Sequence, residues 1–265
     1  MEYENQKLLV ETYENGVAKV TLNNPPLNTV TLDLTREMYD TFKKLDRDER
    51  VRVIVLTGSG TRAFCAGSDI KEFPAVSADV IELKLKKENE AYNMIEQISK
   101  PVIAALEGVV YGGGCELALT CDIRIASETA KFALPEINLG VVPGTGGVMR
   151  MPKTVGLSKA CEMMYLGEPI SAREAKEWRL VGHVVPAGEA VKAALEMAGK
   201  IAEKSSLSLA AIKKYSREMC EETREQSFWK NLLMSDPLFK SPECKEGVEA
   251  FFAKRKPDFH KKNNV

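Results

Sequence analysis

The sequence predicts an α/β fold with a largely parallel sheet, followed by a helical C-terminal part. The apolar runs VRVIVLTG and PVIAAL are typical of strands covered on both faces, because such strands lose the alternation of apolar and polar residues. Segments with helical spacing separate these runs, and this order favours parallel strands joined by crossover helices. From about residue 156 the predicted elements are mostly helical. The 265 residues suffice for one large core, or for a main domain with an appendage.

The first predicted elements are a half-buried strand and an amphipathic helix. Ala18, Val20 and Leu22 alternate with polar residues, and two prolines follow them, which is typical of a strand that ends there. Apolar residues then recur at helical spacing and predict a helix over 31–46. The next element is the buried strand that ends at Gly58.

A second helix is predicted over roughly 78–98, between the two buried strands. It carries the charge run ELKLKKENE, which we interpret as a solvated outer face. The strand PVIAAL follows, and DIRIAS predicts one more strand after it.

The C-terminal half begins with a capping box, SARE at 171–174, which opens a helix, and LVGHVV is a short extended piece. Three further helices are expected, near 187–204, 206–225 and 242–255. The composition changes near residue 200. We therefore expect an α/β core over 1–200 and a helical C-terminal subdomain over 201–265.

Composition and charge exclude several classes of protein. Hydrophobic residues make up 44% and charged residues 28%, which is ordinary for a globular protein. The net charge of −1 argues against a nucleic-acid binder, which usually carries a basic excess. No apolar run approaches the roughly 20 residues of a transmembrane helix. The acidic N-terminus MEYENQKLLVETYENG lacks the apolar core of a targeting peptide, so we expect a cytoplasmic protein without a membrane partner.

The cysteines and histidines argue against a disulfide framework and a metal site. The six cysteines form no CxxC pair and lie mostly in apolar surroundings, so we interpret them as reduced, packing thiols of an intracellular protein. The two histidines, His183 and His260, are far apart in sequence, which weakens any histidine-based triad or zinc site. We expect neither a metal nor a redox cofactor.

The loop TGSGTRAFCAGSDIKEF, 57–73, has two interpretations. Gly58, Gly60 and Ala63 fit the loose dinucleotide fingerprint G-x-G-x-x-G/A after a strand. That fingerprint should open a helix, whereas the following FCAGSD contains another glycine and is typical of irregular backbone. A plain β-turn explains the two glycines without any ligand.

Two more glycine-rich stretches each contain one glutamate. YGGGCELAL, 111–119, places Glu116 in an otherwise apolar run. Its glycines either leave free N–H donors at a helix start or allow that helix to pack closely on a strand. FALPEINLGVVPGTGG, 132–147, places Glu136 directly after a proline, where an exposed first-turn residue is the common alternative.

Taken together, AFCAGSDIKEF, PVIAALEGVVYGGGCELALTCDIRIAS and FALPEINLGVVPGTGG closely resemble the crotonase family, the enoyl-CoA hydratase/isomerase superfamily. The resemblance covers nearly the whole chain, from LNNPPLNTVTLDLTREM to EGVEAFFAKRKPDF. It implies a crotonase-like ββα-superhelix core with a helical C-terminal subdomain. It also implies a homo-oligomer, a trimer or a dimer of trimers, in which the C-terminal helices cover an active site.

The resemblance further implies an acyl-CoA thioester substrate and an oxyanion hole made of two backbone N–H groups. The matching positions are Ser68, after Gly67, and Gly113, the middle glycine of the triplet. Many relatives have alanine in place of Ser68, and a small serine should be tolerated because the N–H is the donor. One such donor is typically worth about 10²–10³ in rate.

The two catalytic glutamates of family hydratases match Glu116 and Glu136, which are separated here as in those enzymes. Two carboxylates that flank one water can supply both the base and the acid that hydration of a C2–C3 double bond needs. By resemblance, Glu116 activates the water and Glu136 exchanges the proton at C2. The pair makes reversible hydration of a 2-enoyl-CoA to a 3-hydroxyacyl-CoA the first choice of reaction.

Other positions match the family's substrate and CoA contacts. Lys71 and Lys254 match positions near the CoA phosphates in relatives, and a lysine ammonium group is a suitable point charge for a phosphate. For both residues, a solvated surface lysine is the alternative. These candidate contacts are Phe64, Cys65, Ala66, Gly67, Asp69, Ile70, Lys71, Gly144 and Lys254. No cofactor is implied beyond the coenzyme A of the substrate.

The sequence leaves the acyl group and two other functions open. GGVMRMPK stands where short-chain fatty enoyl-CoA hydratases usually have GGTQRL, and this version is nearer to the crotonobetainyl-CoA hydratase branch. An enoyl-CoA isomerase of the same fold is a second enzymatic hypothesis. An RNA-binding or scaffolding relative is the non-enzymatic one, against which the glutamate pair and the near-neutral charge both argue.

Overall fold

The computed structural model describes residues 7–220 and 222–260, and its core is a six-stranded sheet in the order β1-β2-β3-β5-β7-β10. β1 is antiparallel to β2, and the remaining neighbours are parallel. The strands of this sheet are β1 (Leu8–Thr12), β2 (Val17–Leu22), β3 (Val53–Gly58), β5 (Val102–Leu106), β7 (Ile123–Ser127) and β10 (His183–Val185). Every residue of β3 and β5 is buried, as the continuous apolar runs predict.

A smaller four-stranded sheet has the order β4-β6-β8-β9. Its strands are β4 (Ala63–Cys65), β6 (Val109–Tyr111), β8 (Lys131–Ala133) and β9 (Ile170–Ser171). In three successive units, one strand joins the large sheet, the next joins the small sheet, and a helical segment follows. The expected ββα-superhelix core is therefore confirmed.

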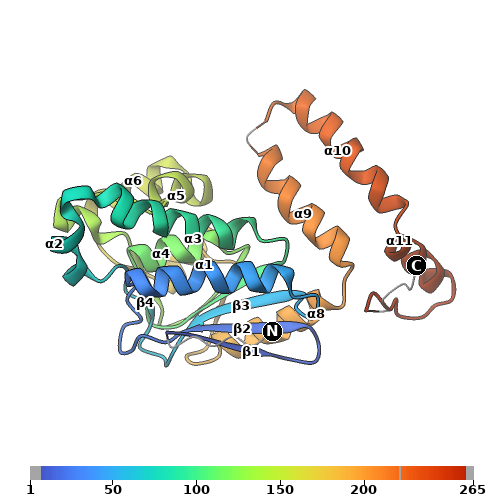
Figure 1. The fold of residues 1–265 in the computed structure, drawn as a ribbon, viewed down its shortest axis with the longest axis horizontal. Helices are drawn as coiled ribbons and strands as arrows, with labels where there is room; N and C mark the ends of the chain where they lie inside the picture. The colour runs from blue at the N-terminus through green and yellow to red at the C-terminus, as the bar shows by residue number, and fades with distance from the viewer. Residues whose placement is uncertain (1–6, 221, 261–265) are drawn as a thin grey trace.

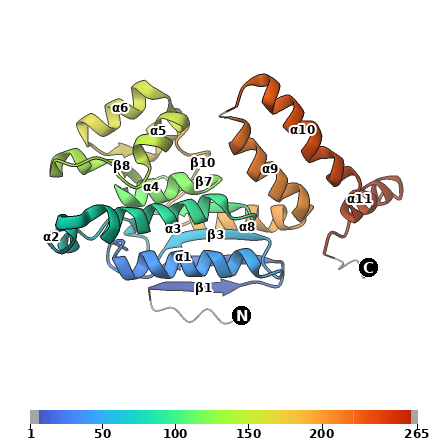
Figure 2. The ribbon, with the colours of Figure 1, turned by 45° about the horizontal axis from the view of Figure 1, so that its top comes forward.

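Helices cover both faces of the large sheet (Figure 1). α1 (Leu32–Arg47) begins at Thr31, whose side chain accepts a hydrogen bond from Leu34 N, and it buries the apolar stripe that the sequence predicts. It lies beside α3 (Lys86–Gln97) on one face (Figures 1 and 2). On the other face, α8 (Ala190–Ala202) packs through a stripe of alanines one turn apart, which lets the helix approach the strands closely.

The charged helix predicted over 78–98 differs from the observed one in two respects. It consists of a 3₁₀ turn (Ser77–Asp79), a π-helical turn (Ile81–Leu85) and α3. The interpretation of its charge run as a solvated face is wrong for Lys84 and Glu88, which are 2% and 1% exposed. Glu88 lies one helical turn before Tyr92, and Lys84 one turn before Glu88, so both continue the buried face of α3 and face the protein interior.

The remaining helices lead from the core to the C-terminal part. They are α4 (Gly113–Thr120), α5 (Gly147–Val155), α6 (Leu157–Leu166), α7 (Ala172–Glu177), α9 (Ser206–Met219), α10 (Arg224–Phe239) and α11 (Pro242–Phe252), with a short α2 (Phe73–Val76) before the π turn. α7 opens with the predicted capping box. The helix predicted to reach residue 225 ends at Met219, and α10 is an additional helix. α9, α10 and α11 extend away from the core (Figures 1 and 2).

Other expectations have direct outcomes in the structure. A strand, β4, follows Gly60 where a dinucleotide fingerprint would open a helix, and residues 59–62 form bends, so the dinucleotide interpretation is wrong there. All six cysteines are free, and Cys220 is exposed rather than packed. Within 7–220 and 222–260, no helix is long and apolar enough to cross a membrane. The first six residues of the acidic N-terminal segment and the last five of the predicted C-terminal subdomain lie outside the described residues.

Candidate active site

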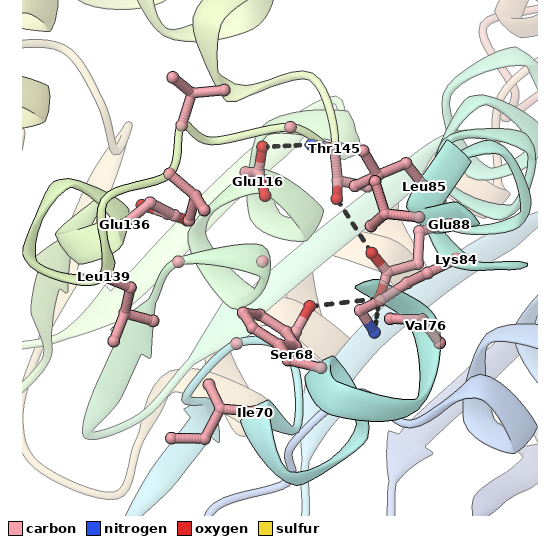
Figure 3. Close-up of a pocket in the computed structure, with 18 of the residues that line it drawn as sticks. Ser68, Ile70, Val76, Lys84, Leu85, Glu88, Glu116, Glu136, Leu139 and Thr145 are labelled. Atoms are coloured by element: carbon pink, nitrogen blue, oxygen red, sulfur yellow. Dashed lines mark hydrogen bonds and ion pairs between the residues drawn. The ribbon is translucent and has the colours of Figure 1, made fainter. Parts of the chain in front are cut away.

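A cavity of about 570 Å³ lies between the start of α4 and the segment 66–88 (Figure 3). The loops 135–145 close its third side. Most of its wall is apolar, with Ile70, Val76, Leu85 and Leu139 among the lining residues. Polar groups enter this wall at a few positions, as is typical of a small-molecule site.

The triple glycine lets α4 begin against the small sheet. A Cβ atom on Gly114 would lie 2.1 Å from the carbonyl oxygen of Cys65, so only glycine allows this approach. Gly113 is the first residue of α4, where a backbone N–H has no partner within the helix. Both interpretations of this glycine stretch therefore apply: Gly114 allows close packing on a strand, and Gly113 leaves a free N–H donor at the helix start.

Ser68 lies next to Gly113. A Cβ atom on Gly113 would lie 3.5 Å from Ser68 N. The groups that flank Ser68 pair with Val30: Val30 N donates to Gly67 O, and Asp69 N donates to Val30 O. In this parallel bridge, Ser68 contributes no hydrogen bond to Val30, so its N–H points to the side of the chain away from Val30. Among the described residues, neither the Ser68 N–H nor the Gly113 N–H donates to an acceptor.

Glu116 lies one turn into α4 and is 2% exposed. Its Oε1 accepts hydrogen bonds from Thr145 N and Gly147 N, both at 2.8 Å. Burial raises the pKa of Glu116 to about 8, although the backbone N–H groups of Gly147 and Thr145 oppose the shift by stabilising the carboxylate. The nearby Glu136 raises this pKa further.

Glu136 lies on the opposite side of the cavity, in the 3₁₀ turn Pro135–Leu139. A Cβ atom on Gly112 would lie 3.0 Å from Glu136 Oε1, so this carboxyl group points at the triple glycine. Its Oε2 is buried and has no hydrogen-bond partner among the described residues. Burial also raises the pKa of Glu136. The structure therefore brings both predicted glutamates and both predicted N–H donors to one cavity.

Two charged residues of the wall were not predicted as site residues. Lys84 Nζ lies 2.8 Å from Glu88 Oε1, and both side chains are buried. Ser68 Oγ and Thr145 Oγ1 donate to the two oxygens of Glu88, each at 3.2 Å (Figure 3). The spacing of Ala91, Tyr92 and Ile95 could have found this pair, because the same helical face continues backward through positions 88 and 84.

The predicted substrate contacts divide into two groups. Ala66, Gly67, Ile70 and Gly144 line the cavity, in addition to Ser68. The other five do not line it. Phe64 and Cys65 are buried in the core, Asp69 caps the 3₁₀ turn Ile70–Glu72, Lys71 is exposed there, and Lys254 is exposed after α11. α11, which Lys254 closely follows, lies at the opposite end of the molecule from α2 (Figure 1).

Within residues 7–220 and 222–260, no group of three or more His, Cys, Asp or Glu side chains is arranged to hold a metal ion. The two carboxyl groups next to two backbone donors can support acid–base chemistry in this cavity.

Comparisons with known proteins identify the family that this chain resembles. The family model described as enoyl-CoA hydratase/isomerase matches residues 12–262. A mitochondrial enoyl-CoA hydratase of Pongo abelii is 40% identical over 92% of this chain and 84% of its own. A carnitinyl-CoA dehydratase of Proteus mirabilis is 36% identical over 94% of this chain and 96% of its own. The crystal structure of an enoyl-CoA hydratase from Bacillus anthracis superposes with a TM-score of 0.92 at 33% identity, covering 96% of this chain and all of the other.

Proposed function

The chain belongs to the enoyl-CoA hydratase/isomerase family, and we propose that it catalyses the reversible hydration of a 2-enoyl-CoA to a 3-hydroxyacyl-CoA. One observation supports hydration in particular: Glu116 and Glu136 line the same cavity, next to the N–H groups of Ser68 and Gly113. Addition of water across a double bond needs a base for the water and an acid for the carbon, and this pair can supply both.

The thioester carbonyl oxygen binds between the Ser68 N–H and the Gly113 N–H. Attack at C3 moves negative charge onto this oxygen, and the two fixed N–H dipoles stabilise it without reorganisation. The position of Gly113 at the start of α4 adds the favourable dipole of the helix end.

Glu116 accepts a proton from the water whose oxygen forms the new bond to C3. Glu136 donates a proton to C2, which takes the electron pair of the former double bond, and solvent exchange then resets both carboxyl groups. Supporting this assignment, Thr145 N and Gly147 N hold Glu116 in a fixed orientation, whereas Glu136 Oε2 has no partner of its own among the described residues.

The reaction adds water without transferring electrons, so we propose no cofactor beyond the coenzyme A of the substrate. We further propose a cytoplasmic homo-oligomer, a trimer or a dimer of trimers, without nucleic-acid or membrane partners. The C-terminal helices support assembly because they expose large apolar side chains, among them Phe228, Trp229, Leu233, Phe239, Phe251 and Phe252. Separate domain roles for 1–200 and 201–265 remain part of this proposal, as do CoA contacts by the cavity-lining Ala66, Gly67, Ile70 and Gly144.

The test is a substrate panel. Hydration of crotonyl-CoA removes the absorbance of the conjugated enoyl thioester, whereas isomerisation of a 3-enoyl-CoA produces it. The panel should include crotonobetainyl-CoA, because one similar protein is a carnitinyl-CoA dehydratase. We expect loss of absorbance with at least one 2-enoyl-CoA. No loss across the panel, together with conversion of 3-enoyl-CoA, would show that the protein is an isomerase.

A further inference from the structure

The buried pair Lys84–Glu88 is the least expected feature of the cavity wall. Both side chains are almost fully buried, at 3% and 2% exposure, in a wall that is otherwise mostly apolar. Burying two charges is expensive, and apolar residues of similar volume often stabilise a fold equally well. Stability alone is therefore a weak explanation for this pair. Lys84 also lies in a π-helical turn, a feature found frequently at functional sites.

Glu88 connects two segments that are distant in the sequence. Its Oε1 accepts from Ser68 Oγ, in the loop after β4, and its Oε2 accepts from Thr145 Oγ1, in the loop before α5. The ammonium group of Lys84 lies beside Oε1 and supplies the opposite charge. One buried carboxylate thus joins both loops, in the arrangement that Figure 3 shows.

Each of the two joined residues also contributes a backbone N–H group to the chemistry. The Ser68 N–H belongs to the proposed oxyanion hole. The Thr145 N–H donates to Glu116 Oε1 at 2.8 Å, and Thr145 O accepts from Arg150 Nη1 at 3.1 Å. A shift of Glu88 would therefore move the oxyanion donor and the partner of the catalytic base together.

We infer that Glu88 is a positioning residue that fixes the oxyanion hole relative to Glu116, through Ser68 on one side and Thr145 on the other. Lys84 Nζ, 2.8 Å from Glu88 Oε1, supplies a countercharge in this mostly apolar wall. This inference rests on the proposed function, because it assigns to the pair a part in the geometry of that reaction.

The first test is a mutant cycle. Glu88→Gln is made in the wild-type chain and in the double variant Ser68→Ala/Thr145→Val, which keeps both backbone N–H groups but removes both hydroxyls. In the wild-type background we expect kcat for crotonyl-CoA to fall about tenfold with little change in KM, because a small displacement of reacting groups lowers the rate. In the double variant, Glu88→Gln should have no further effect, since the two connections are already absent.

A second variant separates positioning from folding. Glu88→Gln removes the nearer countercharge of the buried Lys84 ammonium group and leaves Glu72, whose Oε2 lies 3.6 Å from it, whereas Lys84→Met/Glu88→Met removes both members of the buried pair and should fold. We expect the same loss of kcat. The matched control is Lys86→Met/Glu82→Met, because that pair has the same spacing on the same segment but is exposed, at 54% and 58%. The control should keep the wild-type kcat and KM.

A second readout does not depend on hydration. Acetoacetyl-CoA is a β-keto thioester whose enolate absorbs differently from its keto form, so its absorbance when bound reports on the oxyanion hole. Glu88→Gln should lower the bound enolate signal. If the wild-type protein hydrates no enoyl-CoA, the proposed function is wrong. The inference about Glu88 is then tested by the enolate signal alone: an equal signal in the wild type and Glu88→Gln would overturn it. Equal losses from Glu88→Gln in both backgrounds, a change in KM with kcat intact, or full kcat in Lys84→Met/Glu88→Met would overturn the inference.

Discussion

Burial determines how the carboxyl groups of the cavity titrate. Glu116 is almost fully buried, and its pKa is raised to about 8 because the ionised form loses its water. The two backbone N–H groups that it accepts from oppose this shift without abolishing it. Glu136 is half-buried, and its pKa is raised for the same main reason. Both shifts favour the protonated form, so Glu136 keeps its proton more readily than an exposed carboxyl group, whereas Glu116 must first lose its proton to act as the base.

The activity should depend on the ionisation of Glu116. As the base, Glu116 must lose its proton, so the rising limb of kcat/KM for hydration should reflect a pKa of about 8. Glu136, as the acid, must keep its proton, so kcat/KM should fall again once Glu136 ionises. The measurement is the initial rate at low crotonyl-CoA concentration between about pH 6 and pH 9. A rate that is constant across this interval would contradict the assignment of Glu116 as the base.

The same raised pKa predicts a pH dependence of stability. Between the ordinary carboxyl pKa of 4.5 and about 8, the folded protein holds a proton on Glu116 that the unfolded chain has released. The contribution of Glu116 to the free energy of unfolding is therefore fully present below about 4.5 and is lost as pH rises toward 8. Glu116→Gln cannot lose this proton, so its stability relative to the wild type should increase over that interval. Urea unfolding at about pH 5 and pH 8 measures the difference. If the free energies of unfolding of the wild type and Glu116→Gln change equally between the two pH values, the prediction is wrong.

At the residue scale, sequence reasoning reached the residues that motifs identify and missed those that packing defines. Glu116, Glu136, Ser68 and Gly113 all come together at the cavity. Glu88 was missed because its neighbours in sequence are mostly charged, and a charge run usually means a solvated face. Which face of a helix is buried depends on what packs against it, and that information is tertiary.

At the element scale, α4 shows how a helix start can serve packing and chemistry through adjacent residues. A Cβ atom on Gly114 would meet the backbone of β4 at 2.1 Å, whereas one on Gly113 would make only ordinary contacts, at 3.4 Å from Tyr92 Oη and 3.5 Å from Ser68 N. Neighbouring glycines therefore have separable roles.

Two alanine substitutions test this separation. Gly114→Ala should lower the free energy of unfolding by at least about 3 kcal/mol, because a backbone oxygen cannot move out of the way. Gly113→Ala should fold with a change within about 1 kcal/mol, yet its methyl group beside the Ser68 N–H should lower kcat strongly. Chemical denaturation and steady-state kinetics on both variants measure these effects. If Gly113→Ala keeps the wild-type kcat, Gly113 does not form part of an oxyanion hole.

Long, buried elements could be predicted from the sequence, whereas short or exposed elements could not. β2 and α1 were predicted because each buries a face long enough to impose a period on the sequence. β3 and β5 were predicted from continuous apolar runs, because both of their faces are buried. β4, β6 and β8 have three residues each, too few to show a period. α10 was missed because the part of the helix that the structure describes has no buried residue, so no core imposes a stripe on it.

At the scale of the whole molecule, α9 connects the C-terminal helices to the core through charged groups. Lys213 lies 2.9 Å from Asp122 and donates to the carbonyl oxygens of Ile95 and Lys100. Arg217 pairs with Asp122 and Glu96, and Glu96 in turn pairs with Arg150. Because Arg150 donates to Thr145 O, these contacts connect the docking of α9 to the loop that holds Glu116.

Lys213→Met should weaken this docking. Lys213 is 8% exposed, and its loss leaves Asp122 short of one counterion and two carbonyl groups without a donor. We expect the free energy of unfolding to fall by about 3 kcal/mol, the lower end for a broken buried pair because Arg217 remains. The exposed neighbour Lys214 provides the control, and Lys214→Met should change stability by less than about 0.5 kcal/mol. Equal effects of the two substitutions in denaturant titrations would show that the Lys213 contacts do not hold α9.

The whole-molecule expectations relied mostly on the resemblance. Alternating strands and helices predicted an α/β class, but the distribution of successive strands between two sheets follows from contacts that periodicity does not report. The docking of α9 also depends on long-range ion pairs, which local patterns do not specify.

The central claim is that Glu116 and Glu136 together carry out hydration, and the most direct measurement is the turnover of crotonyl-CoA by Glu116→Gln and Glu136→Gln. Each substitution removes a titratable group while keeping the size of the side chain. We expect kcat to fall by about 10²–10⁴ in each variant, with acyl-CoA binding retained. Wild-type turnover in either variant that binds acyl-CoA normally would contradict the claim.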